Sequence, residues 1–369
     1  MKQLNGISIV IITKGRVKML GDLLESVRVA RNNFLFESEV ILVDDSKKKD
    51  ISKIEKLCIK YSARRVYHSP SIPGKRNRGA EEAKYDIILY LDSDCIASPN
   101  LLNEHYMLFT EDKVGGVAGL LEFVGENTWF WNIIDKSPYV VCFGMPKWLE
   151  KVPWTPTANC SVRKDVLNLI EGFDEKFPKF GGEDVDFGLR LTKQGFVLKC
   201  SKEALVYHAK ETWSSPLVMF KKLWLYGSAN YYLVDKHLDL TIEALPSKPV
   251  IGLVILFFSI IMSIITPVFL LLLPFWFFID LFLITLMFNA IIKENKSTFI
   301  QQLILQILKF LNEMGYACKC IIKLKYVYIY KSLIYFNEEM NEIYKKNVVY
   351  TWGNMIIFGI VFGIVFIIL

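Results

Sequence analysis

The chain has 369 residues, of which 52% are hydrophobic and 14% aromatic. It can therefore bury large apolar surfaces, which excludes a mainly disordered protein, and its length suits about two average domains. The 44 Lys and Arg against 38 Asp and Glu leave a net charge of +6, a bias too diffuse to predict nucleic-acid binding, so no nucleic-acid partner is expected.

Seven cysteines are scattered along the chain without the paired spacing of a zinc site. We expect them to be reduced thiols, most of them buried, as is usual in the cytosol. The first apolar stretch, residues 7–12, is too short for a cleavable signal and runs directly into charged residues. The amino-terminal part is therefore expected to stay on the cytoplasmic side.

The first half of the chain alternates apolar runs of strand length with amphipathic helical patterns. Residues 7–13, 39–45 and 86–94 are apolar, β-branched runs that each end in polar residues. This alternation predicts an α/β domain with a mostly parallel sheet. Ligands of such sheets bind beyond the carboxyl ends of the strands. The polar residues expected to meet there are Thr13, Lys14, Arg16, Asp44, Asp45, Asp92 and Asp94.

A helix predicted over residues 74–85 begins with Lys75 and Arg76, which place positive charge where an anionic ligand can lie. The triplet Asp92-Ser93-Asp94 then closes a strand that is too hydrophobic to be exposed. Two carboxylates at a buried edge are unfavourable without a positive partner, and they fit a Mg²⁺ or Mn²⁺ ion that bridges a diphosphate. The alternative is a solvated turn in which Asp94 caps the next helix. The neighbouring polar strand ends favour the metal.

A second dense stretch runs from residue 157 to residue 196. Gly181-Gly182 followed by Glu183-Asp184 predicts a flexible loop that enters a helix, with Asp186 spaced for an ion pair with Arg190. As structure, this is an acid-rich helix start that needs no chemistry. As chemistry, a carboxylate on a glycine-supported loop that faces a diphosphate can remove a proton from an attacking hydroxyl. The residues alone leave both interpretations open.

The composition changes abruptly near residues 245–249. Residues 250–273 form an uncharged run of 24, long enough to cross a hydrocarbon core of roughly 30 Å. Pro274 is expected to break this run, and residues 275–292 predict a second span that returns through the bilayer. A shallow re-entrant hairpin is the alternative. Residues 348–369 are again uncharged and predict a third span.

The segment 293–350 carries nine Lys and five Glu, which is typical of the cytoplasmic side. Within it, residues 299–310 and 320–336 predict helices that lie in the membrane interface, and core helices of a small soluble subdomain are the alternative. The predicted organisation places a multi-pass protein in the cell membrane, with membrane lipids as partners. Its parts are a cytosolic catalytic domain over residues 1–245, a hairpin of two transmembrane helices over 250–292, basic interfacial helices over 293–347 and a third transmembrane helix over 348–369.

Several motifs in chain order resemble the inverting glycosyltransferases of family 2, which have a GT-A fold. The resemblance covers about residues 7–208. It implies a Rossmann-like, mostly parallel catalytic sheet followed here by an all-α membrane region. One motif would be weak, but the whole series in order is specific. The matching segments are residues 8–16, 41–46, 74–79, 87–94, 157–163, 172–174 and 182–186.

The resemblance implies roles for individual residues. Asp184 is the expected base, with Glu183 beside it as a second catalytic residue. The Mg²⁺ or Mn²⁺ ligands are Asp92, Asp94 and His208, and a purely structural histidine is an equal alternative for His208. Asn159 and Gly182 belong to the acceptor side. The expected nucleotide-sugar contacts are Thr13, Arg16, Asp44, Asp45, Lys75, Arg76 and Asp92.

The implied reaction is a single in-line displacement. It moves a sugar from a nucleotide-diphosphate sugar, with UDP favoured, to a hydroxyl of a lipid-linked or saccharide acceptor. Lys14-Gly15 stands where the family commonly carries Tyr-Asn, which leaves recognition of the nucleobase open.

The alternatives come from two classes. The nearest is a transferase that loads a sugar onto polyprenyl phosphate. A processive polysaccharide synthase is disfavoured, since no Gln-x-x-Arg-Trp follows the acidic loop and Trp224 is preceded by Lys-Lys-Leu. The more distant class is a nonenzymatic nucleotide-binding scaffold or a transporter subunit, suggested by Asp280 within an apolar run.

Overall fold

The computed structural model describes residues 4–177, 181–244, 246–291 and 298–334, together with Gly353, Ile356, Gly359, Ile360 and Gly363. The chain divides into two compact units. Unit 1 comprises Met1–Thr128 and Tyr139–Ser214, and unit 2 comprises Trp129–Pro138 and Ser215–Leu369. The boundary thus falls at residue 215 and not near 245, because the helix that follows residue 215 packs against a later helix of unit 2.

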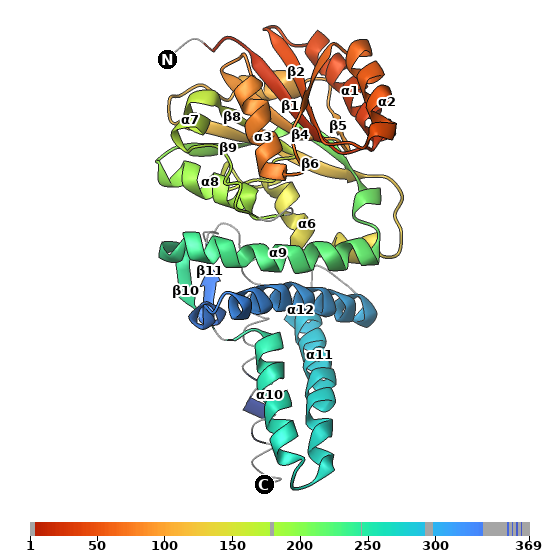
Figure 1. Ribbon diagram of the computed structural model, residues 1–369, viewed down its shortest axis with the longest axis vertical. Helices are drawn as coiled ribbons and strands as arrows, with labels where there is room; N and C mark the ends of the chain where they lie inside the picture. Colours follow the sequence, from red (N-terminus) through yellow and green to blue (C-terminus); the bar gives the residue numbers. More distant parts are fainter. Residues whose placement is uncertain are drawn as a thin grey trace. The chain divides into compact units, whose positions relative to one another are not determined.

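Unit 1 contains a mostly parallel sheet, as predicted (Figure 1). The strand order is β3-β2-β1-β4-β8-β6-β9-β5, with β7 paired to β9. Strands β5, β7 and β8 run antiparallel to their neighbours. The bounds are β1 (Ile7–Thr13), β2 (Ser38–Asp44), β3 (Ala63–Tyr67), β4 (Ile87–Asp92), β5 (Cys95–Ala97), β6 (Val114–Val124), β7 (Lys151–Val152), β8 (Asn159–Arg163) and β9 (Val197–Ala209).

Helices cover both faces of this sheet. Ile9 and Ile11 of β1 belong to the core that the leucines of α1 complete, whereas Val10 faces α3. A Cβ on Gly79 of α3 would lie 2.2 Å from Val10 Cγ1, so only glycine allows this approach. The helices are α1 (Val17–Asn32), α2 (Lys48–Lys60), α3 (Ile72–Glu82), α4 (Leu101–Tyr106), α6 (Pro138–Val141), α7 (Lys164–Leu169) and α8 (Glu183–Lys193), with 3-10 turns η1 (Cys142–Lys147) and η2 (Lys210–Thr212).

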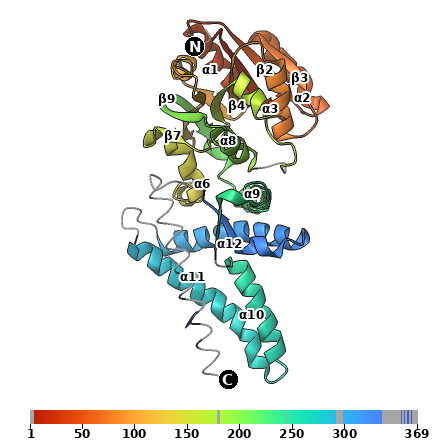
Figure 2. The same ribbon diagram turned by 90° about the vertical axis from the view of Figure 1, so that its left-hand side faces the viewer.

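Unit 2 is mainly helical. In both views α10 and α11 form a hairpin, and α12 lies across the end opposite its tip (Figure 1, Figure 2). Helices α9 and α12 approach closely where each has a glycine: a Cβ on Gly315 would lie 2.2 Å from the carbonyl oxygen of Trp224. The helices are α5 (Trp131–Ile134), α9 (Pro216–Lys236), α10 (Lys248–Met262), α11 (Leu272–Ile291) and α12 (Phe299–Ile322), with 3-10 turns η3 (Leu238–Leu240), η4 (Pro267–Leu271) and η5 (Tyr326–Tyr330).

The hairpin breaks at a different place from the predicted one. Helix α10 ends at Met262, after 15 residues, and Pro267 opens the 3-10 turn that leads into α11. The expected break at Pro274 is therefore wrong: Pro274 lies in the first turn of α11, where its ring displaces no helical hydrogen bond. Of the residues described, only the stretch Pro267–Leu286 is long and apolar enough to cross a bilayer, with a mean hydropathy of 2.4.

The basic segment also differs in part from expectation. Residues 299–310 are helical, as predicted, within the 24-residue α12, which a capping box of Thr298 and Gln301 begins. The helix predicted over residues 320–336 is wrong for residues 323–334, because α12 ends at Ile322, the tyrosines of residues 326–330 form the 3-10 turn η5, and residues 331–333 form a strand. Strand β11 (Lys331–Leu333) pairs antiparallel with β10 (Thr241–Glu243), so unit 2 is not all-α. Most of the predicted third span, residues 348–369, lies outside the described residues.

Candidate active site

The carboxyl ends of β2, β1 and β4 lie side by side in unit 1. Strand β1 pairs with β2, where Thr13 is opposite Asp44, and with β4, which ends at Asp92. Lys75 of α3 reaches this edge: its Nζ donates to the carboxylate of Asp45 at 2.6 Å and to the carbonyl of Thr13 at 3.1 Å. The predicted meeting of three polar strand ends at one edge is therefore confirmed.

Both acids at the end of β2 have cationic partners within the chain. Asp44 is fully buried, and its Oδ2 accepts a hydrogen bond from Arg65 Nε at 2.8 Å. Asp45 contacts Lys75 and lies 3.1 Å from Lys14 Nζ. Burial alone would raise the pKa of Asp45, but the two ammonium groups outweigh it and the pKa lies below its usual value. This edge thus combines two acids with lysines that can also contact an anionic ligand.

Asp94 and His208 come together because β5 pairs with β9. Cys95 lies opposite His208 in that pairing, and ligand atoms of Asp94, Cys95 and His208 lie within 4.8 Å of one another. Asp94 Oδ2 accepts a hydrogen bond from Arg16 Nη1 at 2.6 Å, while its Oδ1 lies 3.7 Å from His208 Nε2. Burial would raise the pKa of Asp94, but His208 and Arg16 lower it overall.

The donor atoms of Asp94 and His208 fit a divalent cation. Their 3.7 Å separation is too long for a hydrogen bond and leaves room for a shared ion. His208 Nδ1 lies 3.3 Å from the carbonyl oxygen of Ala209, which favours the tautomer whose Nε2 lone pair faces Asp94. Mg²⁺ and Mn²⁺ prefer the carboxylate to the thiol of Cys95. Three aromatic rings surround the imidazole and restrict its orientation, those of Phe123, Phe143 and Trp213.

Arg76 connects the end of β4 with the start of α8. Its buried guanidinium donates from Nη1 to Glu183 Oε1 at 2.7 Å, and Nη2 lies 3.6 Å from Asp92 Oδ1. Burial alone would lower the pKa of Arg76, but these carboxylates raise it overall. Asp92 thus faces Arg76, and the structure does not bring it into the group formed by Asp94 and His208. The second oxygen of Glu183 is buried with no hydrogen-bond partner among the described residues.

Asp184 lies in the first turn of α8, as predicted. Gly181 and Gly182 before it have φ values of 83° and 90°, a backbone region that glycine adopts without strain. Burial and the charge of Glu183 raise the pKa of Asp184 to about 7, although Arg76 acts in the opposite direction. A carboxyl group that titrates near neutrality is well suited to accept a proton from a hydroxyl.

The predicted ion pair between Asp186 and Arg190 is confirmed, and it has a structural role. Arg190 Nε donates to the fully buried Asp186 Oδ2 at 2.8 Å. The same guanidinium donates to the carbonyl oxygens of Ile170 and Gly172, the latter at 2.7 Å. It therefore connects α8 to the turn that follows α7.

We expect Arg190→Leu to lower the free energy of unfolding by about 3–5 kcal/mol, because Asp186 would remain buried without its cation. The double variant Asp186→Leu, Arg190→Leu removes both charges and should recover part of that loss. Urea unfolding followed by circular dichroism measures both. A double variant as unstable as the single one would contradict this explanation.

Asn159 does not join the site. It is fully buried, and its amide donates to the carbonyl oxygens of Leu120 and Ala204 at 2.9 and 2.7 Å. Its Oδ1 lies 2.8 Å from Nε2 of His105, whose pKa burial lowers to about 4. Asn159 therefore fixes neighbouring strands and a neutral imidazole inside unit 1.

Two residues of these networks were not predicted. Arg65 contacts Asp44, which is 21 residues away, and His105 contacts Asn159, which is 54 residues away. No local pattern identifies such partners, because only the folded sheet brings them together.

A family model described as "Glycosyl transferase family 2" matches residues 8–170. The chain is 26% identical over 241 residues to the chondroitin synthase of Escherichia coli, an alignment covering 56% of this chain and 35% of that protein. It is 24% identical to the O-antigen biosynthesis protein RfbC of Myxococcus xanthus, covering 59% and 18%. The hyaluronan synthase of Pasteurella multocida is 26% identical, covering 55% and 24%. The chain thus spans about a third or less of the length of each of these relatives.

Solved structures with a similar arrangement include TarS of S. aureus, with a TM-score of 0.42 and 17% identity, covering 60% of this chain and 39% of that one. The mannosyltransferase PcManGT of Pyrobaculum calidifontis, in complex with GDP-Man and Mn²⁺, has a TM-score of 0.47 and 11% identity, covering 99% and 87%. The family match covers β1 to α7, including the strand ends that carry Thr13, Asp44 and Asp94. The chain therefore carries a glycosyl transferase family 2 domain.

Proposed function

We propose that this protein is a membrane-attached, inverting glycosyltransferase. It would move a sugar from a nucleotide-diphosphate sugar, with UDP favoured, to a hydroxyl of a lipid-linked or saccharide acceptor. The observation that carries the proposal is that unit 1, which contains the family 2 match, combines a pair of side chains suited to a divalent cation, Asp94 and His208, with a carboxyl group, Asp184, whose pKa is about 7. Arg76 connects Asp92, two residues before Asp94 in the chain, with Glu183 of the helix that carries Asp184.

In this proposal the strand ends of unit 1 bind the donor. Lys75, Arg16 and the acids of β2 contact the nucleotide and its phosphates. Asp94 and His208 would hold a Mg²⁺ or Mn²⁺ ion, and such an ion would supply positive charge near the departing diphosphate.

Asp184 accepts the proton of the acceptor hydroxyl as that oxygen attacks the anomeric carbon from the face opposite the diphosphate. Inversion follows from this single displacement. Glu183 is a positioning residue, since it binds Arg76 and raises the pKa of Asp184.

A base with a pKa of about 7 favours a hydroxyl acceptor. An ionised phosphate needs much less help, so polyprenyl phosphate itself is the second candidate acceptor, supported by the apolar hairpin of unit 2. We place the protein at the cytoplasmic face of the cell membrane, with membrane lipids around α10 and α11.

Transport, the other class considered, has less support. Asp280 forms an ion pair with Lys248, and both side chains are buried. This pair accounts for the acid in the apolar run without a transported substrate.

The proposal is tested by offering the purified full chain a panel of nucleotide sugars, with Mn²⁺ or Mg²⁺ and a membrane lipid extract. Transfer that requires one nucleotide sugar and a divalent ion is the expected result. Binding of nucleotide with neither transfer nor hydrolysis on the whole panel would favour the nonenzymatic alternative.

We expect Gly182→Ala to slow transfer more than its effect on folding explains. An alanine at this positive φ costs about 1–2 kcal/mol or shifts the start of α8, and with it Asp184. Gly195→Ala is the matched control, because Gly195 has a φ of 84° and no atom within 4 Å of an added Cβ. Thermal unfolding and transfer rates are measured for both. Equal loss of activity in the two variants would contradict a positioning role for Gly182.

A further inference from the structure

The pairing of β5 with β9 places a thiol beside the carboxylate and the imidazole of the candidate cation site. Cys95 is directly opposite His208 in this antiparallel pairing, so the two side chains lie on the same face of the sheet. One ligand atom from each of Asp94, Cys95 and His208 lies within 4.8 Å of the other two. The three residues are buried, with exposed fractions of 7%, 1% and 4%. The site therefore offers a sulfur ligand that the proposed reaction does not use.

The separation of the oxygen and nitrogen ligands favours a tetrahedral ion. Asp94 Oδ1 lies 3.7 Å from His208 Nε2. Two ligands at about 2.0–2.1 Å from a tetrahedral Zn²⁺ ion would lie roughly 3.4 Å apart. Adjacent ligands of an octahedral Mg²⁺ ion would lie roughly 2.9 Å apart and opposite ones roughly 4.1 Å. The observed separation is closest to the tetrahedral value, and a thiolate at about 2.3 Å would supply a third ligand to zinc.

Contacts outside this group already orient two of the three ligands. Arg16 Nη1 donates to Asp94 Oδ2 at 2.6 Å, whereas the other oxygen, Oδ1, is the one nearer to His208. His208 Nδ1 lies 3.3 Å from the carbonyl oxygen of Ala209, which leaves Nε2 as the metal ligand. The side chain of Arg16 is 47% exposed, so an ion can reach the buried group from the solvent beside it.

The ligand types determine which ion binds best. A thiolate, an imidazole and a carboxylate are all ligands that Zn²⁺ prefers, and coordination removes the proton of the thiol. Mg²⁺ prefers oxygen ligands, and Mn²⁺ binds mixed ligand sets more weakly than Zn²⁺. The rings of Phe123, Phe143 and Trp213 restrict water around the imidazole, which strengthens the attraction between a cation and the thiolate. The set therefore favours zinc.

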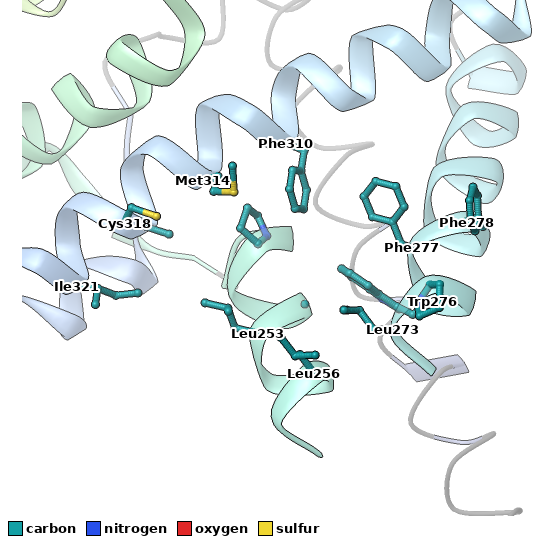
Figure 3. Close-up of a pocket in the computed structure, with 14 residues that line it drawn as sticks. Leu253, Leu256, Leu273, Trp276, Phe277, Phe278, Phe310, Met314, Cys318 and Ile321 are labelled. Carbon is teal, nitrogen blue, oxygen red and sulfur yellow. The ribbon is translucent and has the colours of Figure 1, made fainter. Parts of the chain in front are cut away.

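Two other cysteines have surroundings of a different kind. Cys318 lines an apolar pocket between α10, α11 and α12 (Figure 3). None of the described residues that line this pocket is an Asp, a Glu or a His. Cys160 of β8 is fully buried, and its Sγ lies 3.8 Å from the carbonyl oxygen of Ser161. These cysteines provide a matched control for Cys95 in each unit.

We propose that Asp94, Cys95 and His208 form a zinc site, in which Zn²⁺ competes with the Mg²⁺ or Mn²⁺ ion of sugar transfer. A zinc–sulfur bond forms, the thiol proton of Cys95 passes to solvent, and no atom changes its oxidation state. The zinc site itself needs no part of the proposed function, whereas the competition rests on it. Bound zinc occupies the carboxylate and the imidazole on which transfer depends, and it thereby inhibits the enzyme.

The sulfur ligand is tested with Co²⁺, a substitute for Zn²⁺ whose bond to a thiolate gives a charge-transfer band in the near ultraviolet. The full chain is titrated with Co²⁺ in detergent. We expect a band that saturates at one ion per chain and disappears when Zn²⁺ is added. Cys95→Ala and Cys95→Ser should lose the band, whereas Cys160→Ser and Cys318→Ser should keep it. A band that persists in both Cys95 variants would overturn the proposal, because the thiolate would then come from another residue.

A measurement on the wild-type chain keeps the test valid if the Cys95 variants fail to fold, which thermal unfolding without metal reports. X-ray absorption of the zinc-loaded chain should show one sulfur at about 2.3 Å and nitrogen or oxygen ligands at about 2.0–2.1 Å. A shell of nitrogen and oxygen alone would overturn the proposal.

The preference for zinc is measured as affinity, in competition with a metal-binding dye. Cys95→Ala should weaken Zn²⁺ binding by at least about 100-fold, since loss of an outer partner of a ligand already costs about 10–100-fold. Mn²⁺ affinity should change by less than about threefold, because Mn²⁺ gains little from sulfur. Equal losses for the two ions would contradict a sulfur ligand, because Cys95 would then act only through the shape of the site.

Sugar transfer with Mn²⁺ is measured on the same preparations. Zn²⁺ should inhibit the wild-type chain, and an excess of Mn²⁺ should restore transfer. Inhibition that Mn²⁺ does not relieve would overturn the competition. A cobalt band that depends on Cys95, without any transfer, would refute the proposed function and leave the zinc site standing. Transfer that requires Mn²⁺, without that band, would refute the zinc site alone.

Discussion

Asp184→Asn is expected to abolish sugar transfer while nucleotide and Mn²⁺ binding persist. The amide keeps the shape of the side chain but cannot accept the proton of the acceptor, and loss of a general base typically reduces the rate by about 10²–10⁴-fold. Transfer is measured with a radiolabelled donor, and binding by calorimetry. Asp165→Asn is the matched control, because Asp165 is also an acid in the first turn of a helix, α7, and it lies at the surface. A fully active Asp184→Asn would remove the base from the mechanism.

The pKa of Asp184 adds a pH dependence to this prediction. The base works when ionised, so kcat/KM should rise through pH 7 and then level off. Glu183→Gln removes a charge that raises this pKa, so the rise should move to lower pH. Stability changes in the opposite direction: the folded chain retains a proton that the unfolded chain releases, so wild type should lose stability between about pH 4 and 7. Asp184→Asn should lack that loss.

Asp94→Ala is expected to weaken Mn²⁺ binding and with it the binding of the donor. Asp94 contributes the carboxylate of the pair with His208, and loss of even an outer partner of a metal ligand typically costs about 10–100-fold in affinity. Turnover should also fall, since a well-placed positive charge at the departing diphosphate stabilises the transition state by about 3 kcal/mol. Both effects are measured by calorimetry and by transfer at saturating donor.

Two other variants separate the roles of the neighbouring acids. His208→Ala should resemble Asp94→Ala in Mn²⁺ affinity, whereas Asp92→Ala should lower it less, because Asp92 faces Arg76. Asp22→Asn on α1 is the surface control. Equal Mn²⁺ affinity in wild type and Asp94→Ala would contradict the assignment.

Local patterns predicted most of unit 1. The period-2 and apolar runs of β1, β2 and β4 identified their strands, and the polar ends of those strands identified the edge where Thr13, Asp44 and Asp92 lie. Unit 2 was harder to predict because hydropathy alone does not locate a turn. The apolar run continues through Met262 and Pro267, so the composition places the break at Pro274 although the helix ends twelve residues earlier.

In the candidate site, too, local features could be predicted from the sequence, whereas contacts between distant strands could not. Spacing identified Asp186 with Arg190 and placed Asp184 in the first turn of its helix, since both are local features. Whether Asp92 or Asp94 faces His208 depends on the pairing of β5 with β9, a contact over more than a hundred residues that no local pattern contains. The burial of Asn159 likewise depends on strands distant in the chain.

The anomeric configuration of the product tests the central claim most directly. Transfer from an α-linked nucleotide sugar, followed by NMR of the glycoside, reports whether one displacement or two took place. A base at residue 184 that activates the acceptor in a single step predicts a β-linked product. A product with retained configuration would contradict that role, because retention requires two displacements or an attack from the same face as the departing diphosphate.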